Sequence, residues 1–130
     1  MDTLKKLTGG LIASFMPLAT RNRSFFINNI PDQLIVEHNR EWIASVISGL
    51  LKAVVNHARE TCIQLSAKKQ GETIILEIQE SGCISTYAMA CGLQDVQSMA
   101  TKLGGTLSIS IRKASSTMIA FSFPSLAVAA

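Results

Sequence analysis

The feature that most constrains this fold is a helical stripe of apolar residues followed at once by two alternating runs. The stripe recurs with the ~3.6-residue period of an amphipathic helix, and its members are Trp42, Ile43, Val46, Ile47, Leu50, Leu51 and Val54. Residues 62–68 and 73–79 alternate apolar and polar side chains on either side of the turn sequence Lys69-Gln70-Gly71. This alternation predicts an antiparallel strand pair. The helix is therefore expected to pack its apolar face on a sheet that contains this pair.

Further periodic segments precede this unit. Leucines and a phenylalanine recur at helical spacing over residues 4–20, and residues 24–29 alternate as a strand. A brief strand over residues 34–37 stays open. Asn39 is the expected N-cap residue of the helix that carries the stripe, because an Asn side chain can accept a hydrogen bond from the first turn.

A third helix is expected over residues 93–103, with four side chains facing inward: Val96, Met99, Ala100 and Leu103. Gly104-Gly105 ends this helix, because a helix end commonly needs a residue at positive φ. Alternation over residues 106–111 and 118–123 predicts a second hairpin. The complete order is helix, strand, helix, hairpin, helix, hairpin. It predicts an α/β (α+β) two-layer sandwich with about three helices on one face.

Size and composition fit one domain over residues 1–130, with a core over about 24–124. The chain has 130 residues, of which 48% are apolar and 16% charged. A chain of this size and composition can bury a hydrophobic core without disulfide bonds or structural metal ions. Its net charge of +3 is mild, and no aromatic residues interleave with the basic ones, so no nucleic-acid partner is expected. The cysteines, Cys62, Cys83 and Cys91, are odd in number and lack paired spacing. They indicate thiols in a reducing, cytoplasmic compartment and no zinc site.

Two interpretations of the N-terminal segment stay open. Lys5-Lys6 and the apolar stretch that runs to Ala19 are similar to a secretory signal peptide. The stretch is interrupted, however, by Gly9, Gly10, Ser14 and Pro17, and its helical spacing favours an amphipathic helix packed on the domain. No run approaches the ~18 apolar residues of a membrane span, so none is expected.

In order and spacing, the motifs resemble the ATP-binding domain of sensor histidine kinases and of their gyrase and chaperone relatives, the Bergerat fold. The resemblance covers about residues 4–124. It rests on the runs Gly49-Leu-Leu-Lys-Ala-Val-Val-Asn-His-Ala58 and Glu80-Ser-Gly-Cys-Ile84, the helix start Gly92-Leu93 and the turn Gly104-Gly-Thr106. It implies a histidine kinase-like ATPase domain of bacterial two-component signalling, with a mixed, largely antiparallel sheet.

The first run departs from the family at the positions that serve metal and water. The family's box reads like Asn-Leu-Leu-x-Asn-Ala-x-Lys-His-Ala, and its second Asn, which holds the metal that bridges the phosphates, falls on Ala53. The first polar position, which orients or activates a water in relatives, falls on Gly49. Neither residue supplies the oxygen ligands that a hard cation needs, so no metal ligand is expected. Asn56 lies about one helical turn further on and either substitutes in part or is a solvated helix residue.

The second run departs as well. The family's run is Asp-x-Gly-x-Gly, and its Asp accepts a hydrogen bond from the adenine amino group. Glu80 keeps the carboxylate on a longer side chain, Gly82 is kept, and Ile84 replaces the second glycine. Either a vestigial purine pocket remains, or this is a plain turn with Glu80 exposed. The family's lid is reduced to residues 85–91, and Gly92 alone is kept at the helix start whose backbone amides receive phosphate.

These departures favour a degenerate domain that acts in signal transduction as a regulatory or protein-interaction module. Residues 1–30 contain no histidine that could be a phosphoacceptor, so we expect no autonomous kinase activity, and enzymatic activity stays uncertain. The expected partner is a response regulator, a kinase or another regulator, and a homodimer stays open. The expected partner surface lies near Glu80, Cys83 and Cys91.

Three alternatives remain. The first is a weak ATP- or purine-nucleotide-binding domain of a two-component histidine kinase system, with a vestigial site made of Glu80, Gly82, Gly92 and Asn56. No cofactor is expected beyond residual ATP or ADP. The second is a small phosphotransfer protein, against which the missing acceptor histidine argues. The third is an unrelated α/β domain with a coincidental pattern.

Overall fold

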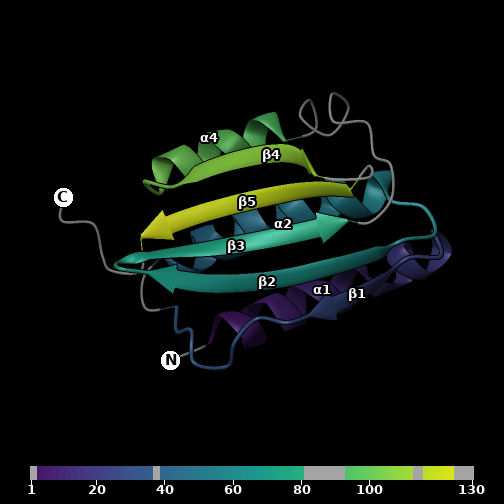
Figure 1. Ribbon diagram of the computed structural model, residues 1–130, viewed down its shortest axis with the longest axis horizontal. Helices are drawn as coiled ribbons and strands as arrows, with labels where there is room; N and C mark the ends of the chain where they lie inside the picture. Colours follow the sequence, from purple (N-terminus) through teal and green to yellow (C-terminus); the bar gives the residue numbers. More distant parts are fainter. Residues whose placement is uncertain (1–2, 37–38, 81–92, 113–115, 125–130) are drawn as a thin grey trace.

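The computed structural model describes residues 3–36, 39–80, 93–112 and 116–124, which form two layers (Figure 1). One layer is an open five-stranded sheet, and the other consists of helices on a single face of it. The helices of these residues are α1 (Leu4–Arg21), α2 (Arg40–His57) and α4 (Gln94–Lys102). The strands are β1 (Phe25–Asn28), β2 (Cys62–Gln70), β3 (Thr73–Glu80), β4 (Thr106–Arg112) and β5 (Ser116–Pro124). The expected two-layer sandwich is confirmed.

The sheet is mixed and largely antiparallel. Its strand order is β1-β2-β3-β5-β4. β1 runs parallel to β2, and the other neighbouring pairs are antiparallel. The hairpin between β2 and β3 is tighter than the sequence predicts, because Gln70 still pairs with Thr73. Gly71 permits this turn with a φ of 61°, a value that costs glycine little.

One face of the sheet builds the core. Successive strand residues point to opposite faces, and the side chains of Ile74, Leu76 and Ile78 on β3 are almost completely buried. Their cross-strand partners on β5 are buried as well: Phe123, Phe121 and Ile119. α2 packs over this face and buries Ile43, Val46, Ile47, Leu50, Leu51, Ala53, Val54 and Val55. The predicted stripe therefore packs on the sheet as expected, except at its first member.

That first member, Trp42, is half exposed. The sequence predicts it to face inward, but 49% of its surface is accessible. Ile43 takes the inward position in the first turn of α2, and Trp42 lies about 100° away round the helix, at the margin towards α4. Asn39 occupies the N-cap position as predicted, yet it adopts a left-handed conformation (φ 57°) and its side chain makes no capping hydrogen bond.

α1 packs on the domain as an amphipathic helix. Thr3 caps it by accepting a hydrogen bond from the Lys6 backbone N–H (3.2 Å), and Leu4 and Ala19 are fully buried. At its other end, Asn22 Nδ2 donates to the backbone oxygen of Val55 on α2 (2.8 Å). Within the described residues, no helix is both long and apolar enough to cross a membrane.

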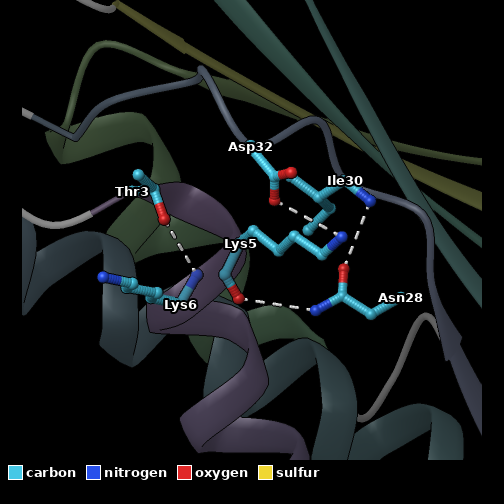
Figure 2. A network of polar contacts seen from close by, with 6 residues as sticks. All are labelled: Thr3, Lys5, Lys6, Asn28, Ile30 and Asp32. Carbon is cyan, nitrogen blue, oxygen red and sulfur yellow. Dashed lines mark hydrogen bonds and ion pairs between the residues drawn. The ribbon is translucent and has the colours of Figure 1, made fainter.

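The segment after β1 is held against the start of α1 (Figure 2). Asn28 Nδ2 donates to the backbone oxygen of Lys5 (3.4 Å), and Asn28 Oδ1 accepts from the Ile30 N–H (3.2 Å). Lys5 also pairs with Asp32 (3.5 Å). Residue 37 of the brief strand expected over residues 34–37 lies outside the described residues. In the described part, Ile35 forms one bridge with residue 3, because the chain begins helix α1 directly after residue 3.

α4 ends where the sequence predicts. Gly104 follows the last turn with a φ of 77°, and its N–H donates to the backbone oxygen of Thr101 (3.0 Å). Gly105 then passes so close to β5 that an added Cβ would overlap the carbonyl oxygen of Ser122. The chain therefore passes directly from the end of α4 onto the sheet without room for a side chain at position 105.

We predict that Gly105→Ala lowers the free energy of unfolding by about 1–3 kcal/mol, because the overlap with backbone cannot be relieved by a side-chain rotation. Gly10→Ala is the matched control, since nothing lies within 4 Å of a Cβ on the exposed face of α1. It should raise stability by about 0.5–1 kcal/mol through helix propensity. Urea unfolding measures the stability of both variants. Equal effects of the two substitutions would contradict the close approach of Gly105 to the β5 backbone.

Candidate functional site

The helix layer contains an open groove of about 260 Å³ between α2 and the first turns of α4. Its lining residues are Gly49, Lys52, Ala53, Asn56, His57, Asp95 and Val96. These residues include the positions on which the sequence places the family's metal and water functions. The structure thus brings the predicted site residue Asn56 into one groove with the departures at Gly49 and Ala53.

The two helices come into close contact at Gly49. A Cβ built on Gly49 would lie 2.5 Å from Cγ2 of Val96 on α4, a separation that atoms in packed proteins do not tolerate. The Val96 methyl groups thus fill the volume into which a side chain at position 49 would project. The polar residue expected of relatives at this position therefore does not fit unless the Val96 side chain or α4 moves.

Ala53 lies one turn further along the same helix and is 7% exposed. Its backbone oxygen accepts the contact from His57 Nδ1 (2.8 Å), which ties the imidazole to the helix. Its methyl group offers no ligand to a cation. Across the described residues, no group of three or more His, Cys, Asp or Glu side chains could hold a metal ion.

The polar side chains of the groove have mixed charge. Lys52 and Asn56 are exposed on α2, and Asp95 is exposed in the first turn of α4. A carboxylate in this turn interacts favourably with the helix N-terminus and would repel a phosphate that approached the same turn. Asp95 therefore makes this groove less favourable for a triphosphate than it would be with a neutral side chain in the first turn of α4.

Glu80 lies at the end of β3 and is 2% exposed. It has the same phase as Ile78 and Leu76, so its side chain is on the face of the sheet that the helices cover. The interpretation of an exposed Glu80 is therefore wrong. The partner surface expected near Glu80, Cys83 and Cys91 stays a prediction, because Cys83 and Cys91 lie outside the described residues.

Sequence reasoning missed Thr117. Thr117 pairs with Glu80 in the register between β3 and β5, and it is 3% exposed. Its hydroxyl and the Glu80 carboxyl are thus buried polar groups on one face of the sheet. The signal was present, because Thr117 has the phase of the inward residues Ile119 and Phe121 on β5.

Several predicted features lie outside the described residues. They are Gly82, Cys83, Ile84, the short segment 85–91 and Gly92. Cys62 is described and lies on β2 with its side chain as a thiol. Burial raises the pKa of the Cys62 thiol, which keeps it protonated near neutral pH and lowers its reactivity.

No protein-family model and no curated protein matches the sequence. Solved structures do match. A histidine kinase of Acinetobacter baumannii, AdeS, superposes with a TM-score of 0.83 at 17% identity over 96% of this chain and 66% of that one. The catalytic domain of histidine kinase ThkA gives 0.79 at 15% identity over 95% and 94% of the two chains. A histidine kinase from Burkholderia phymatum gives 0.80 at 15% identity over 96% and 70%.

The chain thus has the fold of histidine kinase catalytic domains, the histidine kinase-like ATPase fold. It spans about two thirds of the AdeS chain and nearly all of the ThkA catalytic domain. At these identities the likeness establishes the fold. The expected resemblance is confirmed at that level.

We predict that Gly49→Asn destabilises the domain by about 1–3 kcal/mol, because the new side chain overlaps Val96. In a double-mutant cycle, Val96→Ala should recover part of this loss, with a coupling of about 0.5–3 kcal/mol. Lys52→Asn places the same residue at an exposed position of the helix and should change stability by at most ~0.5 kcal/mol. Strictly additive effects in urea unfolding would argue against the steric contact.

Proposed function

We propose that this domain is a regulatory or protein-interaction module of histidine kinase-type signalling without autonomous kinase activity. The observation that carries the proposal is the packing of Val96 over Gly49. A polar group that positions water at this point would need the volume that the valine methyl groups occupy. Ala53, where relatives hold a metal ligand, supports the same conclusion because it is apolar and buried.

A signalling partner is supported by the neighbours of the fold. Histidine kinase ThkA is known in complex with the response regulator protein TrrA, and its structure matches this chain with a TM-score of 0.76 at 17% identity. We propose a partner of the same general kind: a response regulator, a kinase or another regulator. We also propose that the domain works in the cytoplasm, where its thiols stay reduced.

A second candidate function is weak purine-nucleotide binding. The burial of Glu80 beside Thr117 favours it, because a buried carboxylate on the helix-facing side of the sheet is suited to accept a hydrogen bond from an amino group. A plain turn would not need a buried carboxylate at this position. Binding of this kind would not require a metal.

Calorimetric titration with ATP and ADP, each with and without magnesium, separates the two candidates. We expect no heat of binding that depends on magnesium, and no incorporation of phosphate from labelled ATP. Ala53→Asn alone should not restore incorporation, because Val96 still fills the volume above Gly49. The combined variant Gly49→Asn, Ala53→Asn and Val96→Ala tests whether the volume filled by Val96 is what prevents phosphate incorporation.

The four titrations have distinct meanings. Silence in all of them supports a module that acts through protein contacts. Binding without magnesium supports the purine pocket at Glu80, and Glu80→Gln should then weaken it. Magnesium-dependent binding or measurable phosphate incorporation by the unmodified chain would contradict the proposed loss of kinase activity.

A further inference from the structure

Trp42 lies between two grooves on the surface where α2 meets α4. The wider groove, of about 290 Å³, is lined by Asn39, Trp42, Thr101, Lys102, Leu103 and Gly104. The narrower one, of about 200 Å³, is lined by Glu41, Trp42, Ser45 and Met99. With 49% of the Trp42 surface accessible, the indole is available as a large apolar anchor, the type of side chain that dominates protein interfaces.

The two grooves carry opposite charges. Lys102 belongs to the wider groove and Glu41 to the narrower one, and both side chains are exposed. The ion pairs of the described residues join Lys5 to Asp32 and Arg23 to Glu60, so neither Glu41 nor Lys102 is paired within this part of the chain. One cation and one anion thus flank the indole, each within its own groove.

We propose that this surface, which we call the Trp42 surface, pairs with the same surface of a second copy of the chain. In such a dimer the two-fold axis lies in the interface and is perpendicular to the line from Lys102 to Glu41 at its midpoint. Lys102 of each copy then lies opposite Glu41 of the other copy. Both copies contribute the same surface, and two Lys102–Glu41 ion pairs form across the interface. Each indole can enter a groove beside the indole of the other copy.

A second copy fits this surface better than a partner of one charge sign. An acidic partner would be attracted by Lys102 and repelled by Glu41, and a basic partner would meet the reverse. Like charges brought together in an interface cost affinity. The inference rests on the proposed interaction role, but it does not depend on whether the chain binds nucleotide.

The test is sedimentation velocity of the complete chain from low micromolar to near-millimolar concentration. We expect a monomer–dimer equilibrium, which Trp42→Ala weakens by roughly tenfold or more. Glu41→Lys and Lys102→Glu should each abolish self-association, because every contact then joins like charges. Circular dichroism confirms that each variant is folded. Lys68→Glu, an exposed reversal on β2, is the control that should leave the equilibrium unchanged.

Mixing the two reversed variants provides the decisive measurement. Glu41→Lys supplies two cations and Lys102→Glu two anions, so the pair should form a heterodimer although neither variant associates with itself. The double variant Glu41→Lys with Lys102→Glu should again self-associate. Raising the salt concentration should weaken each of these dimers, because exposed charges are screened.

Two results would overturn the inference. One is a chain that stays monomeric at all concentrations. The other is a dimer that is indifferent to Trp42→Ala and to both charge reversals. Either result leaves the proposed interaction role intact, since that role is tested by the nucleotide titrations and by binding of another signalling protein.

Discussion

The contact between α2 and the sheet is the interaction on which the other elements depend. α2 buries a face of Ile, Leu and Val side chains against β3 and β5, and burial of each such side chain contributes about 1.5–3 kcal/mol. With this face fixed, the adjacent face of the same helix can only be directed towards α4. The residues that decide the candidate site, Gly49 and Ala53, therefore have positions set by the core.

Core and groove differ in how they match the resembled family. The inward positions of α2, β3 and β5 have the apolar pattern of a two-layer sandwich, whereas the groove presents Gly49 and Ala53 where the resembled family has polar residues. The proposed lack of kinase activity rests on this contrast between core and groove. Glu80 ends a core strand and is a buried carboxyl group.

Periodicity predicted nearly the whole fold, since the helices and strands of this domain each have one apolar face. It failed where neighbours rather than pattern decide exposure. Trp42 continues the stripe of α2 but is half exposed at the margin towards α4, and the burial of Glu80 depends on its place opposite Thr117. Motif comparison identified Gly49 as a departure from the resembled family. It could not reveal that Val96 occupies the volume beside Gly49, because that contact joins residues far apart in the sequence.

The packing of Val96 against Gly49 also couples these two positions to each other. A single substitution that places a polar side chain at position 49 would overlap the valine. Replacing the valine alone would open a void and also lower stability. Both single substitutions lead to a less stable protein, so the two positions are expected to tolerate change only together.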